Sequence, residues 1–189
     1  TRFRNVTGVQ TCALPICALL PTITMTAILA APTYAASDIK VGVITTTTGP
    51  LKPYGDSYLD ALNWGLKYYT GGKMAINGRK FAITIKDDAG DPDLATSYFK
   101  DMASNGTRMI VGSSNLNSAI ALAAQAEQSK VLFISGSVKN DTITNASSKY
   151  VFRSGNTATQ DLATFAGIKP LSGRRIVIFV EDNNFGAGI

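Results

Sequence analysis

The sequence contains no histidine, and its only two cysteines, Cys12 and Cys17, lie close to its start. A Ser-His-Asp triad, a Cys-His nucleophile and the usual zinc or iron ligand sets therefore cannot be assembled from the residues after Cys17. The same residues carry no disulfide framework and no cysteine for a lipid anchor. What they offer for chemistry is carboxylate, hydroxyl and amide side chains, and no metal site is predicted.

The glycine motifs that cradle phosphate groups are also missing. No Gly-x-Gly-x-x-Gly follows the first predicted strand, and no Gly-x-x-x-x-Gly-Lys-Ser/Thr occurs in the sequence. A nucleotide-dependent enzyme is therefore not expected, and no cofactor is predicted. Although the net charge is +5, the basic residues are scattered, which argues against a nucleic-acid partner.

Charged side chains are absent between Asn5 and Ser37. A membrane-spanning helix needs about twenty mainly apolar residues, but prolines and threonines interrupt this stretch. The shorter apolar run Cys17–Ala31, with small residues up to Ala35, fits a secretory signal cleaved before Ala36 better than a retained membrane anchor.

The residues before this run do not look like the start of a natural signal. The segment Val6–Ile16 resembles a translated sequencing adapter, so we interpret residues 1–35 as an adapter-like artefact plus a signal peptide. The remainder is predicted to be secreted and soluble, with a periplasmic location.

Apolar, β-branched runs alternate with segments of helical spacing in the remainder of the chain. In the helix expected at 54–69, Leu59, Leu62, Leu66 and Tyr69 form one apolar stripe. The alternation predicts an α/β fold, a doubly wound parallel sheet with helices on both faces. Strands are expected at 39–45, 81–85, 109–112, 131–134, 150–153 and 176–180, and helices at 54–69, 92–105, from Ser118 to about Ser129, and at 157–171.

Short polar side chains follow three of the predicted strands, at Thr45–Thr48, Ser113–Ser118 and Ser135–Ser137. The carboxyl ends of parallel strands meet at one edge, where open α/β sheets bind small ligands. Hydroxyls and amides can hydrogen-bond a small polar solute without reacting with it. The sequence therefore predicts a binding site formed by these three loops.

Individual residues near these loops have two interpretations each. Asn117 and Ser118 either bind a ligand carboxylate or cap the helix that follows. Tyr54 stacks on the ligand or belongs to the core, with the ligand favoured because Tyr54 lies beside the first loop. Phe185 either lines the site or packs internally.

The one cluster of carboxylates, at Asp87, Asp88, Asp91 and Asp93, is better explained by structure than by catalysis. Asp91 before Pro92 is placed as a helix N-cap, and Asp87 and Asp88 end a strand. No catalytic residue is predicted from it.

The order of these features resembles a known family. Ile39-Lys-Val-Gly-Val43 through Thr48-Gly-Pro50, then Asp87-Asp88-Ala-Gly-Asp91-Pro92, and then Ile110-Val-Gly112 before a Ser/Asn loop are similar to type I periplasmic solute-binding proteins of the branched-chain amino acid transporter group. The resemblance runs from about Asp38 to Gly186. It implies two flavodoxin-like α/β lobes that close on a solute and deliver it to an inner-membrane ABC permease.

The resemblance also implies how this chain is divided and which residues meet the solute. Residues 36–155 would form the N-terminal lobe, and 156–189 a hinge crossing and the start of a truncated second lobe. In the family, Leu116 and Lys139 correspond to a serine and a threonine of amino-acid binders, so amides, urea and aromatic acids stay open as solutes beside leucine, isoleucine and valine. The ligand-binding residues implied are Tyr54, Leu116, Asn117, Ser118, Ser137, Lys139 and Phe185.

Two other functions are kept as alternatives to solute capture for ABC import. One is a ligand-sensing domain of a receptor or regulator with the same fold. The other is an enzyme that uses the carboxylates Asp87 and Asp88, which a loss of activity without loss of folding in their variants would indicate.

Overall fold

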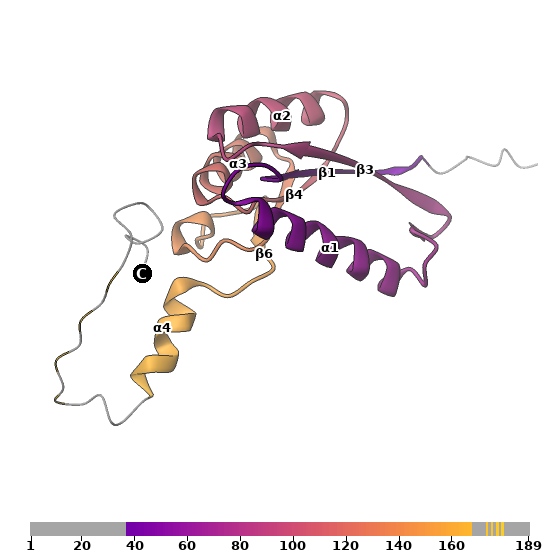
Figure 1. Cartoon of the computed structure of the whole chain (residues 1–189). Helices are drawn as coiled ribbons and strands as arrows, with labels where there is room; N and C mark the ends of the chain where they lie inside the picture. Colours follow the sequence, from indigo (N-terminus) through magenta and orange to yellow (C-terminus); the bar gives the residue numbers. More distant parts are fainter. Residues whose placement is uncertain (1–36, 168–172, 174, 176, 178, 180–189) are drawn as a thin grey trace, which may run out of the picture. The chain divides into compact units, whose positions relative to one another are not determined.

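The computed structural model describes residues 37–167, together with 173, 175, 177 and 179. Six strands form one sheet in this part of the chain, joined by helices (Figure 1). The strands are β1 (Ile39–Thr45), β2 (Ala75–Ile76), β3 (Arg79–Asp87), β4 (Met109–Gly112), β5 (Leu132–Ser135) and β6 (Val151–Arg153), and the helices are α1 (Lys52–Tyr69), α2 (Pro92–Ser104), α3 (Leu116–Ser129), the 3-10 turn η1 (Asp141–Ile143) and α4 (Ala158–Ala166).

The sheet has the strand order β2-β3-β1-β4-β5-β6. All neighbouring pairs are parallel except β2 and β3, which form an antiparallel hairpin that the sequence analysis missed. The chain goes from β1 to β3 on one side and then crosses to β4 on the other. The predicted doubly wound parallel sheet is confirmed, with β1 at its centre.

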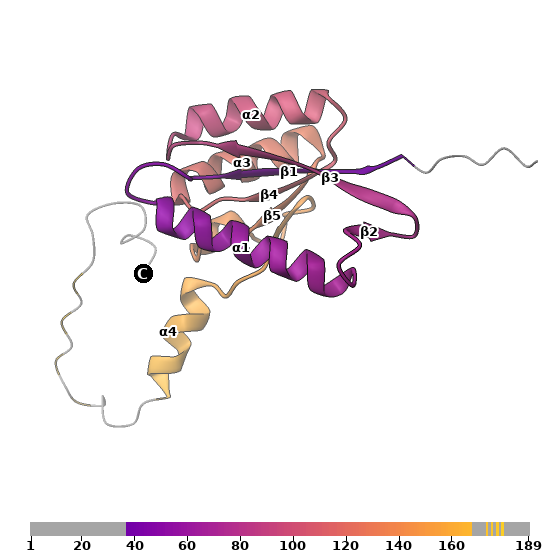
Figure 2. The same ribbon diagram turned by 45° about the vertical axis from the view of Figure 1, so that its right-hand side comes forward.

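Helices cover both faces of the sheet, as Figure 2 shows with α1 on one side and α2 and α3 on the other. This follows from alternation along the strands, because Val43 and Ile44 point to opposite faces. On the α2 and α3 side, Phe99 and Phe133 are completely buried in the larger core. On the α1 side, a smaller core is built on Val41, Val43 and Val111.

The helix α1 begins at Lys52, two residues before the predicted start, because Pro53 fits the first turn of a helix. Leu59 and Leu62 pack against the smaller core as predicted. Tyr69 was predicted to join them, and this is wrong: it is 85% exposed, and Thr70 is the buried neighbour. The 3.6-residue period carries the buried face past Tyr69 at the end of the helix.

The start of α2 follows its local sequence. The Asp91 side chain accepts hydrogen bonds from the backbone N–H groups of Asp93 and Leu94, and Pro92 occupies the first helical position. The predicted N-cap is therefore confirmed, and its contribution is typically about 1 kcal/mol.

The end of the chain is described only in part. The helix predicted at 157–171 is observed as α4, Ala158–Ala166, whereas the strand predicted at 176–180 and Phe185 lie largely or wholly outside the described residues. Among the helices that are described, none combines the length and hydropathy that crossing a membrane requires.

Candidate functional site

The three polar loops lie at one edge of the sheet. They follow β1, β4 and β5, which are adjacent and parallel, so their carboxyl ends coincide. The N–H group of Gly136 donates to the carbonyl oxygen of Gly112 over 2.8 Å, which ties the third loop to the end of β4, directly before the second loop. Connections from β1 and β4 leave in opposite directions, and such a switch point is where open α/β sheets bind ligands.

The first loop is tied to its neighbours by its own hydroxyl groups. Thr45 Oγ1 and Ser114 Oγ share a hydrogen bond of 3.1 Å, and Thr46 Oγ1 donates to Asp88 Oδ1 over 2.6 Å. Thr45 and Thr46 are 0% and 1% exposed. The sequence analysis expected the hydroxyls of this loop to meet a solute; for Thr45 and Thr46 this is wrong, because burial and partners within the protein occupy them.

Two aspartates at the end of β3, its last residue Asp87 and the following Asp88, hold this loop from the other side. Asp87 Oδ1 accepts hydrogen bonds from the N–H groups of Thr47, at 2.8 Å, and Ala89, at 2.9 Å. Burial raises the pKa of the Asp87 carboxyl, but these hydrogen bonds, with others from the hydroxyls of Thr48 and Thr47, outweigh it and lower the pKa to about 2. The structural interpretation of this carboxylate pair is thereby supported.

Close packing also fixes α1 against the first loop. A Cβ atom added to Gly55 would lie 1.7 Å from the carbonyl oxygen of Thr46, so only glycine permits this approach. Tyr54, the preceding residue, is 63% exposed, which rules out the core as its location. Tyr54 is therefore exposed at the start of α1, next to the residue that packs against the first loop.

The N-terminus of α3 is capped by Asn115, whose Oδ1 accepts from the N–H group of Ser118 over 3.1 Å. The alternative that Asn117 or Ser118 supplies the capping side chain is therefore wrong. Asn117 is exposed, whereas Leu116 packs partly against the larger core. Ser118 is fully buried, and its Oγ has no hydrogen-bond partner among the described residues.

The third loop passes beneath α1. A Cβ atom added to Gly136 would lie 2.3 Å from Cε2 of Tyr58, so the tyrosine ring covers this glycine closely. Burial raises the pKa of the Tyr58 hydroxyl to about 12. Ser135 is buried and Ser137 is exposed at the same edge.

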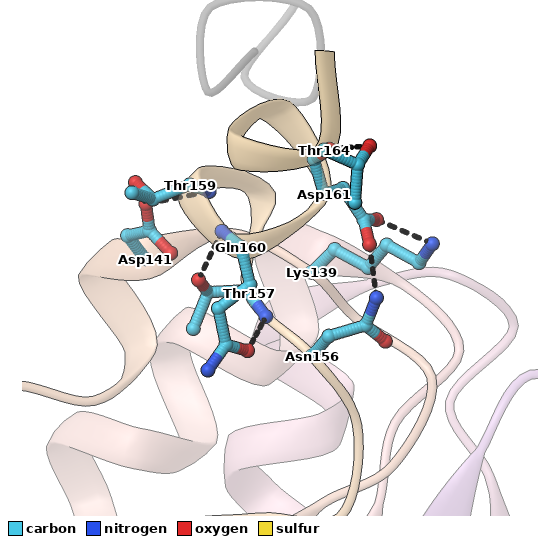
Figure 3. A network of polar contacts seen from close by, with 8 residues as sticks. All are labelled: Lys139, Asp141, Asn156, Thr157, Thr159, Gln160, Asp161 and Thr164. Atoms are coloured by element: carbon cyan, nitrogen blue, oxygen red, sulfur yellow. Dashed lines mark hydrogen bonds and ion pairs between the residues drawn. The ribbon is translucent and has the colours of Figure 1, made fainter. Parts of the chain in front are cut away.

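Beyond the third loop, Lys139 contacts residues of α4. Its Nζ lies 2.7 Å from Asp161 Oδ2, and its carbonyl oxygen accepts from the N–H group of Ala158 over 2.6 Å. Asn156 donates to the other oxygen of Asp161 (Figure 3). Lys139 was singled out as a ligand contact, and the structure gives it a carboxylate partner within the protein.

A second set of bonds in Figure 3 joins the η1 turn to the start of α4. Asp141 accepts from both the hydroxyl and the N–H group of Thr159, and the hydroxyl bond is the main reason why the pKa of Asp141 is lowered. Thr157 and Gln160 form a reciprocal capping box at the same helix end.

Sequence reasoning placed Ser114 and Asn115 in the second loop and Asp88 at a strand end, but it did not predict the contacts that these residues and Tyr58 make. The role of Asn115 could have been predicted, because an asparagine directly before a helical segment is a frequent N-cap. No local pattern predicts the contacts of Asp88, Ser114 and Tyr58, since these contacts join segments distant in sequence.

An open, doubly wound α/β sheet with polar loops at its switch point defines a class of domain that binds small molecules at that edge. The family comparison specifies the class: residues 38–189 match the model of the periplasmic binding protein family, and the chain belongs to this family. Its members are solute-binding transport proteins.

Relatives and solved structures agree with this assignment. The Leu/Ile/Val-binding protein BraC3 of Rhizobium johnstonii is 26% identical over 170 residues, which cover 89% of this chain and 46% of that protein. An ABC-type branched-chain amino acid transporter structure from Rhodopseudomonas palustris matches with a TM-score of 0.62 and 33% identity, covering 66% of this chain and 34% of that one.

A third match carries a bound molecule. The solute-binding protein of an ABC transporter from Rhodopseudomonas palustris BisB5, solved with 3,4-dihydroxy benzoic acid, is 28% identical with a TM-score of 0.59, over 70% of this chain and 37% of that one. The chain thus spans less than half the length of the relatives and structures it matches here.

Proposed function

We propose that the protein is the extracytoplasmic solute-binding component of an ABC importer, that it is not an enzyme, and that it works in the periplasm. The observation that carries the proposal is the convergence of three polar loops at the switch point of the sheet. Membership of the periplasmic binding protein family supports it. Its partner would be an inner-membrane ABC permease.

The solute would be an amino acid or a similar small polar or carboxylate compound, held between two lobes. Residues 36–155 would form the first lobe and 156–189 the crossing to the second, after a leader at 1–35. Relatives named for leucine, isoleucine and valine, and the neighbour solved with an aromatic acid, set the range of candidates. The contacts we propose are Tyr54, Leu116, Asn117, Ser118, Ser137, Lys139 and Phe185.

The test is titration of the full-length protein by calorimetry with leucine, isoleucine, valine, simple amides and 3,4-dihydroxybenzoate. We expect saturable binding of at least one of these solutes. No binding to any of them would overturn the proposal.

A pair of tyrosines on α1 makes a matched test of the site. Tyr54 lies beside the first loop and Tyr69 at the far end of the same helix, and both are exposed. Loss of an aromatic contact costs on the order of 1 kcal/mol, so Tyr54→Ala should weaken the affinity for the solute by about fivefold to tenfold. Tyr69→Ala should leave the affinity unchanged, and equal effects of the two variants would place the solute elsewhere.

A further inference from the structure

One carboxylate lies completely buried beneath the edge that carries the three loops. Asp88 is 0% exposed and follows β3, on the opposite side of β1 from β4. Burying a carboxylate is costly unless hydrogen bonds compensate it. The hydrogen bonds that Asp88 accepts therefore indicate its structural role.

The carboxylate oxygens of Asp88 reach the loops after both β1 and β4. Oδ1 accepts from Thr46 Oγ1 at 2.6 Å and from the N–H group of Gly90 at 3.0 Å, and Oδ2 accepts from Ser113 Oγ at 3.2 Å. Asp88 thus connects three successive strand ends across the switch point. Hydrogen bonds to a charged acceptor are about twice as strong as neutral ones.

The bond to Ser113 continues towards α3. Ser113 Oγ donates a hydrogen bond to Asp88 and accepts one from the N–H group of Asn115 at 3.1 Å. Asn115 in turn caps α3 through the N–H group of Ser118. Asn115 thus links the two sets of bonds, the first through its backbone N–H and the second through its side chain, from the buried carboxylate to the helix start that holds three of the proposed solute contacts.

We infer that Asp88 is a positioning residue for solute binding: it sets the distance between the loop after β1 and the N-terminus of α3 without touching the solute. The inference rests on the proposed function and adds to it a residue that does not line the site. Its action passes through Thr46 on one side and through Ser113 and Asn115 on the other.

The principal variant is Asp88→Asn, which keeps the volume but offers Ser113 a donor instead of an acceptor. Ser113→Ala removes the bond altogether, whereas in Asp88→Asn the Ser113 hydroxyl can only accept from the new amide and the charge-assisted bond is lost. On the full-length protein, each should raise the Kd for L-leucine or 3,4-dihydroxybenzoate, whichever the wild type binds more tightly, by about tenfold, which is about 1.4 kcal/mol. The double variant should be little weaker than Ser113→Ala alone, because both substitutions act on the same connection.

The control is Asp91→Asn, the same substitution three residues further along the chain. Asparagine caps a helix about as well as aspartate, and the side chain of Asp91 bonds to N–H groups at the start of α2. The bond from the N–H group of Asp91 to the carbonyl oxygen of Asp88 is made by the backbone, so the substitution leaves it in place. Its Kd should equal that of the wild type. Hydrogen exchange supplies a readout that needs no solute: in Asp88→Asn, the amides of Gly90 and Asn115 should exchange faster, while those in the middle of α2 should not.

Loss of stability alone does not change the Kd of the folded molecules. A tenfold rise of the Kd at a temperature well below unfolding therefore indicates a changed geometry of the binding site. If Asp88→Asn does not fold, Ser113→Ala and Thr46→Val each remove one arm and give the same comparison. Folded variants that bind like the wild type, or a double variant with fully additive losses, would overturn the inference and leave the proposed function standing. A wild type that binds none of the solutes would overturn the proposed function itself.

Discussion

A single methyl group added at Gly55 provides a sharp test of how the first loop and α1 are joined. The new Cβ atom would lie 1.7 Å from the carbonyl oxygen of Thr46 and 2.7 Å from its carbonyl carbon. Hydrogen bonds to Ser114 and Asp88 hold Thr46 in place, so neither segment can withdraw freely. Overpacking typically costs 1–3 kcal/mol, and for contact with rigid backbone we expect Gly55→Ala to lower the free energy of unfolding by about 3 kcal/mol.

The matched control lies in the same helix. Gly65 has no atom within 4 Å of an added Cβ, so Gly65→Ala should raise the free energy of unfolding by about 0.5–1 kcal/mol through its better helix propensity. With a urea m-value of about 2 kcal/mol per molar, the two unfolding midpoints should differ by roughly 2 M. Coinciding midpoints, or a more stable Gly55→Ala, would refute the reasoning.

Three further expectations concern the neighbouring loops and α4. The pKa of Asp87 falls from 3.8 to about 2 on folding, so its contribution is present above about pH 4 and is lost as the pH falls through about 2; Asp87→Asn should lack this loss in acid unfolding followed by circular dichroism. Gly136→Ala should destabilise the protein by about 1–3 kcal/mol in thermal unfolding, and less in a Tyr58→Leu background, because the added Cβ meets the Tyr58 ring; equal costs in both backgrounds would contradict this contact. Thr157→Ala should remove the capping box and weaken the start of α4 by about 1 kcal/mol, seen as faster hydrogen exchange of the Gln160 amide.

The strands and the turn chemistry could be predicted because their signals are local. The β-branched run of β1 and the Asp91-Pro92 helix start each depend on neighbouring residues only. The prediction that Tyr69 belongs to the buried stripe of α1 was wrong, because at the end of the helix a shift of one residue separates an exposed side chain, Tyr69, from a buried one, Thr70. The β2–β3 hairpin was missed because β2 has only two residues and too little pattern.

The place of the candidate site was predictable, whereas its internal bonding was not. Strand alternation dictates that the loops after β1, β4 and β5 share one edge, and they do. Which hydroxyls are buried there depends on side chains brought together by folding, such as Thr46 with Asp88. A sequence shows that a threonine can donate a hydrogen bond, but not that an aspartate 42 residues away accepts it.

The exposed side of α1 offers a built-in spectroscopic reporter. The sequence has one tryptophan, Trp64, which is 68% exposed and stacks on Tyr68 with ring centroids 5.4 Å apart and planes 13° from parallel. An indole in water emits red-shifted fluorescence, and the adjacent phenol can pass excitation to it. A later part of the same polypeptide, or a membrane partner, that binds to this side of α1 would bury Trp64. Its emission would then shift towards the blue, without any label being attached.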